Sequence, residues 1–228
     1  MKPKSAVVLL SGGVDSTVLL HHVVRELHCR PVHALSFAYG QRHRRELACA
    51  RAQAQTVGVT AHEVIDLGFL GPLLRSGSAL IEGGAAVPNL AELTEEALRQ
   101  PPTYVPNRNM LLLSLAAAYA EANGLYDLFY GAQAQDEYGY WDCTAEFLQR
   151  INDTLALNRA RPVRVHAPFI DKPKAYTVGL GLRLGVDFGQ TWSCYAGGEV
   201  ACGVCPTCVE RVNAFHSQGA LDPLTPGA

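Results

Sequence analysis

The sequence predicts an α/β fold in which helices wrap a parallel sheet. Apolar runs rich in β-branched residues alternate along the chain with stretches of helical period. Hydrophobic residues make up 48% and charged residues 18% of the 228 positions, which is the composition of a folded globular protein. Because this length suffices for one ordinary domain and a small appendage, we expect an α/β domain over residues 1–190 and a C-terminal element over 191–228.

The clearest strand, loop and helix follow one another near the N-terminus. The apolar run 6–10 predicts a buried strand, and residues 11–16 form a tight loop. Helical period over 17–27 then places Val18, Leu19, Val23, Val24 and Leu27 on the inward side. The same alternation predicts a strand at 32–38, a helix at 44–57 and a strand at 62–67.

The stretch 71–106 breaks this alternation with prolines, glycines and acidic residues. We expect it to form an insertion over the C-terminal edge of the sheet, with at most a short helix. A strong helix follows at 107–122, where Leu111, Leu112, Leu115 and Ala116 recur on one side before a C-cap at Asn123 and Gly124. The remaining elements are a strand at 128–130, a helix at 144–157, a strand at 163–165, a helix at 174–184 and a fraying tail beyond 217.

The charge balance favours a small substrate over a polyanion. Nineteen basic and 21 acidic residues give a formal charge of −2, so no overall positive field exists to hold nucleic acid. The apolar run near the N-terminus is far shorter than the ~20 residues of a membrane span. We therefore expect a cytoplasmic protein that binds neither nucleic acid nor membrane.

The segment from Ser11 to Thr17 reads SGGVDST and lies between the first predicted strand and helix. Free backbone N–H groups and the helix dipole attract anions at such a position. Gly12 and Gly13 let the main chain approach an oxygen, and the loop serines and threonine add hydroxyl donors. Asp15 would repel a phosphate unless it faces a magnesium ion or hydrogen-bonds the loop itself. The spacing fits neither a Walker loop nor a dinucleotide-binding loop, and the alternative is a plain glycine turn.

Seven cysteines are present, and four of them fall after residue 190. Such crowding in a reducing compartment suggests metal ligands more than disulfides. Cys202, Cys205 and Cys208 recur at intervals of three, and Cys194 lies upstream across a glycine pair, so we expect four thiolates around a structural zinc ion. An iron–sulfur cluster and four unrelated buried thiols are the alternatives.

Polar segments follow several predicted strands: FAYGQRH at 37–43, YVPNRN at 104–109 and YWDCTAEF at 140–147. Singly, each fits a helix cap, a turn or a solvated face. SGGVDS resembles the signature of PP-loop ATP pyrophosphatases, which implies the adenine nucleotide alpha hydrolase-like, doubly wound parallel fold. Together with Lys174, TWSCY at 191–195 and CGVCPTC at 202–208, the segments resemble the 7-cyano-7-deazaguanine synthase family of the queuosine precursor pathway, over 7 to about 215.

The resemblance implies that ATP activates 7-carboxy-7-deazaguanine as an acyl adenylate, that ammonia gives the amide, and that a second adenylation gives the nitrile. It implies ATP, Mg²⁺ and Zn²⁺ as cofactors, free ammonia and a homodimer. Lys174, Arg108 and Asp15 are the expected catalytic residues. The expected ATP-binding residues are Leu10, Ser11, Gly12, Gly13, Val14, Asp15, Ser16, Thr17, Tyr39 and Gln41; those expected to bind the substrate are Arg42, His43, Asn107, Asn109, Asp136, Tyr140 and Asp142.

The chain departs from the family pattern where Trp141 and Thr144 replace a usual proline and arginine, and at Tyr176 and Thr177. A subfamily that acts on another deazaguanine acid, or that stops at the amide, fits these departures. Two other classes compete with this interpretation. One is a tRNA thiolase or lysidine-type synthetase, which should carry a basic face and a reactive cysteine pair. The other is a nucleotide sensor or scaffold without enzymatic activity.

Overall fold

The computed structural model describes residues 3–42, 45–95, 101–134 and 140–225. Its centre is a five-stranded sheet of order β3-β2-β1-β4-β5, in which every neighbouring pair is parallel. The chain fills one side of β1 with β2 and β3 and then crosses to the other side with β4 and β5, so the topological switch point lies between β1 and β4. The strands are β1 (Ala6–Leu9), β2 (Val32–Ala38), β3 (Ala61–Asp66), β4 (Asp127–Phe129) and β5 (Arg164–His166).

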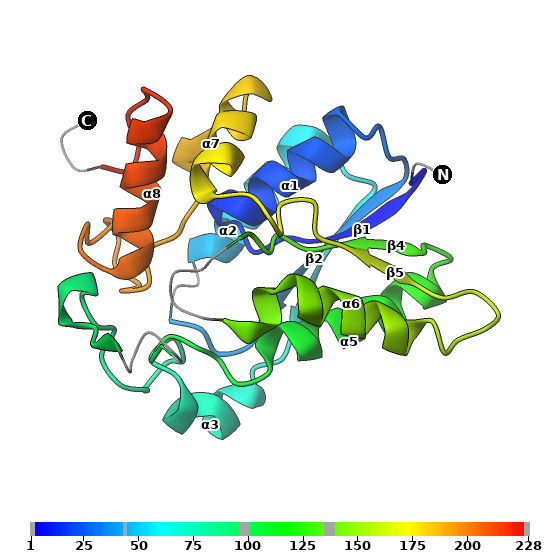
Figure 1. Cartoon of the computed structure of the whole chain (residues 1–228), viewed down its shortest axis with the longest axis horizontal. Helices are drawn as coiled ribbons and strands as arrows, with labels where there is room; N and C mark the ends of the chain where they lie inside the picture. The colour runs from blue at the N-terminus through cyan, green and yellow to red at the C-terminus, as the bar shows by residue number, and fades with distance from the viewer. Residues whose placement is uncertain (1–2, 43–44, 96–100, 135–139, 226–228) are drawn as a thin grey trace.

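Helices cover both faces of this sheet (Figure 1). One face carries α1 (Val14–Arg25), α2 (Arg45–Val57), α7 (Lys174–Arg183) and α8 (Pro206–Ser217), and the other carries α5 (Arg108–Ala122) and α6 (Ala145–Leu155). Shorter elements are α3 (Leu70–Leu74), η1 (Arg75–Gly77), η2 (Leu90–Glu92), η3 (Trp141–Cys143) and η4 (Phe188–Gln190). No helix among the described ranges has the length and apolar character needed to cross a bilayer.

Two apolar cores result from the alternation of side chains along the strands. Ala6 and Val8 of β1 pack with α1, α7 and α8 on one face. Val7 packs with α5 and with Phe147 of α6 on the other face. Burial on both faces explains why the central strands are continuous apolar runs, and it confirms the predicted doubly wound α/β class.

The predicted elements match the observed ones closely, with two informative differences. Helix α1 begins at Val14, about one turn before the predicted start, because extended Gly13 serves as its N-cap. Asp15 and Ser16 therefore lie in the first helical turn and not in a free loop. In α5 the packed side is formed by Leu113, Ala116, Ala117 and Ala120, whereas Leu111 and Leu115 are 38% and 40% exposed.

The C-terminal helix α8 was not predicted from the sequence. It begins with Pro206 at its first position, where the missing N–H is not needed, directly after Cys205. Ala214 and Phe215 enter the same apolar core as α1, and the Phe215 ring meets Phe188 edge to face at 5.0 Å between centroids. The cysteine-rich segment thus continues into a helix that packs on the sheet domain.

Candidate active site and cysteine centre

A cavity of about 260 Å³ opens at the carboxyl ends of β1 and β4, on the switch point of the sheet. Its wall is formed by the loop after β1, the end of β2, the segment after β4 and the start of α5. Residues of α2, α7 and α8, of the 140–143 segment and of the 192–195 segment complete it. Its polar lining consists of Ser11, Asp15, Ser16, Tyr39, Glu46, Arg108, Asn109, Tyr130, Gln133, Tyr140, Lys174, Ser193, Tyr195, Thr207 and Glu210.

The Ser16 hydroxyl organises the loop after β1. Its oxygen accepts hydrogen bonds from the backbone N–H groups of Ser11 at 3.1 Å and Gly12 at 3.3 Å, and it lies 2.9 Å from the Ser11 hydroxyl. Gly12 has a φ of 92°, and a Cβ at that position would lie 2.0 Å from the Glu46 carbonyl oxygen. The close packing of the loop against α2 therefore requires glycine.

The N-terminus of α1 faces this cavity without a side-chain cap. Gly13 precedes the helix, and no side chain bonds the N–H groups of its first turn. Val14, Asp15 and Ser16 line the cavity, so the positive end of the helix dipole is directed into it. Gly131 comes close from the other side, where an added Cβ would lie 3.2 Å from the Ser16 nitrogen. This part of the cavity is suited to an anion.

Lys174 connects three segments beside the loop. Its ammonium group lies 2.7 Å from Asp15 Oδ2 and 3.5 Å from Glu210 Oε2, and its side chain is only 11% exposed. The side-chain amide of Gln133 bridges the same two groups. When its nitrogen donates to Asp15 Oδ1 at 3.2 Å, its oxygen accepts from the Lys174 ammonium at 3.0 Å. A cation held between two carboxylates at an anion site can shift its contacts toward phosphate when that ligand arrives.

Arg108 supplies a second positive charge to the cavity. Its guanidinium donates to the Tyr39 hydroxyl at 3.4 Å. Burial alone would lower the pKa of Arg108, but interactions with Tyr39, Tyr195 and Asp142 outweigh burial and raise it, so the group is permanently charged. Burial raises the pKa of the Tyr39 hydroxyl, which Arg108 only partly opposes, so Tyr39 is a neutral partner.

The start of α5 and the segment before α6 form the opposite wall. Asn109 donates its side-chain amide to the Asp142 carbonyl and to Cys143 Sγ, at 3.2 and 3.4 Å. The Asp142 carboxylate is 3% exposed and accepts the backbone N–H of Asn109 at 3.2 Å. Asp142 thus holds the first turn of α5 and lies behind the cavity wall. Tyr140 lines the cavity, and its hydroxyl lies 2.6 Å from the Thr103 hydroxyl.

Six of the predicted site residues do not line the cavity: Gly12 and Asp142, described above, and Thr17, Gln41, Arg42 and Asn107. Thr17 is fully buried within α1, and Asn107 is an exposed residue with a φ of 54° that precedes α5. Arg42 donates to the carbonyls of Ala79, Gly84 and Ala85, so it fastens the insertion to the end of β2. Gln41 lies at a different cavity, and two further candidates, His43 and Asp136, lie outside the described residues.

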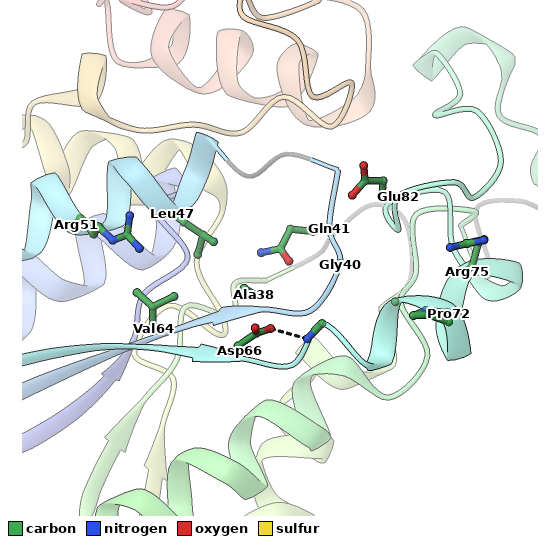
Figure 2. A pocket seen from close by; sticks show the side chains of 12 residues that line it. Ala38, Gly40, Gln41, Leu47, Arg51, Val64, Asp66, Pro72, Arg75 and Glu82 are labelled. Carbon is green, nitrogen blue, oxygen red and sulfur yellow. Dashed lines mark hydrogen bonds between the residues drawn. The ribbon is translucent and has the colours of Figure 1, made fainter.

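Gln41 lies at a second, larger cavity of about 530 Å³ beside the ends of β2 and β3 (Figure 2). Its amide is fully engaged: the oxygen accepts from the Tyr39 N–H at 2.8 Å, and the nitrogen donates to the Phe37 carbonyl and to Glu46. This cavity contains no part of the loop after β1, so we do not assign the chemistry to it. It is lined by Ala38, Gly40, Gln41, Leu47, Arg51, Val64, Asp66, Gly68, Gly71, Pro72, Arg75 and Glu82.

The four C-terminal cysteines converge as predicted. The sulfur atoms of Cys194, Cys202, Cys205 and Cys208 all lie within 4.8 Å of one another. A tetrahedral metal with bonds of about 2.3 Å to sulfur requires sulfur separations of roughly 3.8 Å, and Cys202 and Cys208 are 4.0 Å apart. Four converging sulfur donors therefore fit a tetrahedral metal ion.

The thiols of this cluster influence one another's ionisation. Hydrogen bonds from the Cys205 and Cys208 thiols lower the pKa of Cys194, whereas donating to that sulfur raises the pKa of Cys205 to about 12 and raises that of Cys208. One thiolate forms readily, and the crowded sulfurs resist further ionisation. A divalent cation relieves the repulsion among such thiolates.

The cysteine centre is hydrogen-bonded to the loop after β1. Trp192 lies two residues before Cys194, and its backbone N–H donates to the Gly12 carbonyl at 3.0 Å. The buried Arg211 guanidinium of α8 holds the same segment through the Thr191 hydroxyl at 2.8 Å and the Phe188 carbonyl at 3.0 Å, and it pairs with Asp222. The segment that carries the first cysteine therefore also positions the loop.

Several cavity residues were not predicted from the sequence, above all Tyr130, Gln133 and Glu210. Tyr130 and Gln133 flank Gly131, so their position directly after a strand was the available signal. Glu210 gave no signal, because its place in the site depends on a helix that was not predicted. Two of the residues that depart from the family pattern have local roles: Trp141 donates to the Tyr104 hydroxyl, and the Thr144 hydroxyl caps α6 through the Phe147 N–H.

Comparison with known families gives a match over nearly the whole chain. The profile of a family described as queuosine biosynthesis protein QueC matches residues 5–219. A 7-cyano-7-deazaguanine synthase of Clostridium kluyveri is 41% identical over 227 residues, which cover 97% of this chain and 97% of that relative. A relative of the same name from Chromohalobacter salexigens is 44% identical over 219 residues, covering 96% and 84% of the two chains.

Solved structures with a similar fold are far more distant in sequence. The U34-tRNA thiolase NcsA from Methanococcus maripaludis matches with a TM-score of 0.52 at 13% identity, over 96% of this chain and 65% of the thiolase. The NMN synthetase from Francisella tularensis matches with a TM-score of 0.51 at 13% identity, over 96% of this chain and 78% of that chain. At such low identity these likenesses show a shared fold alone.

Proposed function

Since this chain belongs to the QueC family of queuosine biosynthesis proteins, we propose that it is a 7-cyano-7-deazaguanine synthase. It converts 7-carboxy-7-deazaguanine and ammonia to the nitrile at the expense of ATP, as an AMP-forming carbon–nitrogen ligase. The observation that carries this proposal is one cavity at the β1 and β4 ends that holds an uncapped helix N-terminus together with Lys174 and Arg108. The rival assignment to a tRNA thiolase rests only on fold.

We assign the β- and γ-phosphates of ATP to the loop after β1. Ser11, Gly13 and the first turn of α1 line the cavity, and no side chain caps the N–H groups of that turn. Uncapped N–H groups at a helix start bind anions. Leu9, Leu10, Leu35 and Phe37 give the same cavity an apolar side, which suits the adenine ring. Tyr39 lines the same cavity, and its hydroxyl accepts a hydrogen bond from Arg108.

In the reaction, a carboxylate oxygen of the acid attacks the α-phosphorus and pyrophosphate leaves. Ammonia then displaces AMP from the acyl carbon to form the amide. The amide oxygen is adenylated by a second ATP with release of pyrophosphate, and loss of AMP and of both protons from the nitrogen leaves the carbon–nitrogen triple bond. Negative charge grows on pyrophosphate in both adenylations, so Lys174 and Arg108 act twice as fixed positive charges.

The acid is assigned to the wall opposite the loop. Asn109 and Tyr140 reach this part of the cavity from α5 and from the residues before η3. The carboxylate of Asp142 is engaged with the helix start, so we propose that Asp142 positions Asn109 and does not touch the base itself. Ammonia enters free in solution in this proposal.

Asp15 is the residue we propose to hold magnesium, because its carboxylate lines the cavity in the first turn of α1. When bound, the ion supplies positive charge that neutralises the phosphates. For the cysteine centre we propose zinc, since four sulfur donors leave no open position and the site is then purely structural. We further propose a homodimer through the outer face of α5, where Met110, Leu111 and Leu115 are exposed apolar side chains.

The deciding experiment incubates purified protein with ATP, ammonium and 7-carboxy-7-deazaguanine, and follows products by mass spectrometry and nucleotides by chromatography. We expect the nitrile as the product. Two AMP and two pyrophosphate should form for each nitrile, because the proposed reaction includes two adenylations. Accumulation of the amide would place the chain with an amide-forming ligase, and formation of ADP in place of AMP would overturn the proposal.

A further inference from the structure

One residue that lines the cavity has a buried side-chain hydroxyl without a hydrogen bond. Four side-chain atoms in the described part of the chain are buried with no partner, on Thr17, His21, Tyr130 and Thr177. Only one of these four residues, Tyr130, lines the cavity at the β1 and β4 ends. Its side chain is 4% exposed, so water does not compensate the hydroxyl. A buried hydroxyl without a partner costs stability, which makes its presence in a binding cavity informative.

The backbone fixes Tyr130 at the switch point of the sheet. It follows β4 directly, and its N–H donates to the His166 carbonyl of β5 at 3.1 Å, so the residue cannot move away from the sheet easily. Burial, with Cys143 and Asp142 nearby, raises the pKa of the hydroxyl. Tyr130 is therefore a neutral group that can donate one proton, located beside the wall that carries Asn109 and Tyr140.

We propose that Tyr130 is a specificity-determining residue whose hydroxyl donates a hydrogen bond to an acceptor oxygen of the bound deazaguanine acid. This inference rests on the proposed function for the identity of the ligand, and it assigns a residue that no sequence motif marks. The energetic reason is direct: the ligand supplies the partner that the folded chain lacks. A ligand without that oxygen leaves the hydroxyl unpaired and is rejected.

Tyr130→Phe separates this role from a structural one, because the two predict opposite changes in stability. Removing an orphan hydroxyl should leave the melting temperature of the ligand-free protein unchanged or raise it by up to about 3 °C. The same variant should lose about 10- to 100-fold in kcat/KM for the acid, as expected for a hydrogen bond to a polar or charged ligand group. The KM for ATP should stay within about 2-fold of the wild type.

Tyr119→Phe is the matched control. Its hydroxyl has a partner, His33 Nδ1 at 2.9 Å, and Tyr119 does not line the cavity. This variant should melt at a lower temperature and keep the wild-type kcat/KM. A melting temperature of Tyr130→Phe that falls as far as that of the control would show that the hydroxyl already has a partner in the folded chain, and it would overturn the assignment.

Kinetics and binding distinguish the remaining outcomes. An unchanged kcat/KM for the acid, or a rise confined to the KM for ATP, also contradicts the assignment. If the wild-type protein forms no nitrile, the proposed function is wrong. The role of Tyr130 is then tested by how far the acid alone raises the melting temperature of the protein. The acid should raise the melting temperature of the wild type more than that of Tyr130→Phe; an equal rise, or none in the wild type, refutes the role.

Discussion

Replacing Lys174 by methionine removes the cation that stands between the two carboxylates of the cavity. The side chain keeps a similar length, but the contacts of 2.7 Å to Asp15 and 3.5 Å to Glu210 are lost. In the proposed reaction the same ammonium stabilises the departing pyrophosphate. Loss of one such fixed donor typically costs about 10²- to 10³-fold in kcat, or roughly 2.7–4 kcal/mol.

The fold should also become less stable, by an amount that burial determines. Exposed ion pairs contribute at most about 1 kcal/mol, and breaking a fully buried pair costs about 3–5 kcal/mol. The Asp15 and Glu210 side chains are 23% and 25% exposed, so we place the loss between these limits, at about 1–3 kcal/mol. For a chain of this size that corresponds to a melting temperature lower by about 2–12 °C.

The assay measures AMP formation with the acid and ammonium saturating, at a temperature where the variant is still folded. Lys172→Met is the matched control, because Lys172 pairs with the exposed Asp171 near the same helix and does not line the cavity. The control should keep its kcat within about 2-fold and its melting temperature within about 2 °C of the wild type. The reasoning is refuted if Lys174→Met retains more than about a third of the wild-type kcat.

Three further changes have sharp expected outcomes. Gly12→Ala places a Cβ against backbone at a φ of 92° and should abolish AMP formation, whereas Gly58→Ala, at a φ of 66° in open space, should cost stability alone; equal activity of the two would contradict the tight loop. Asp222→Ala leaves a buried guanidinium unpaired and should lower stability by about 3–5 kcal/mol, measured by urea unfolding, while Glu146→Ala in an exposed pair should cost under about 1 kcal/mol. Cys205→Ser should lose the proposed zinc ion in elemental analysis and melt at a lower temperature; full retention of metal would exclude a four-cysteine site.

The parts predicted from the sequence are those with local signals. Strand β2 was predicted to the residue, because a buried parallel strand is a continuous apolar run bounded by turns. The loop from Ser11 and the four cysteines were found because their residues lie close together in the sequence and their spacing reflects their geometry. Glu210 had no such signal, since only the packing of α8 brings it to Lys174.

The carboxylate of Asp142 shows why residue type alone misassigns a role. A carboxylate after a strand can bind the N–H edge of a base or the N–H groups of a helix start, and both partners offer the same donors. The structure shows a bond to the Asn109 N–H and burial behind the cavity wall. The choice depends on which helix start lies nearby, and α5 begins more than thirty residues earlier in the chain.

The cysteine centre is connected by hydrogen bonds, through its N-terminal flanking segment, to the loop after β1, although about 180 residues separate the two in the sequence. Arg211 binds the segment on the N-terminal side of Cys194 through Thr191, and the Trp192 N–H binds the Gly12 carbonyl. Gly12 packs against α2 with no room for a Cβ, so this bond joins the loop to the 191–194 segment at a tightly packed point. A metal that holds Cys194 in place would therefore also hold the loop after β1 in place. In the proposed function, a structural metal at this centre affects ATP turnover without touching the nucleotide, and its removal by a chelator should lower kcat before it unfolds the sheet.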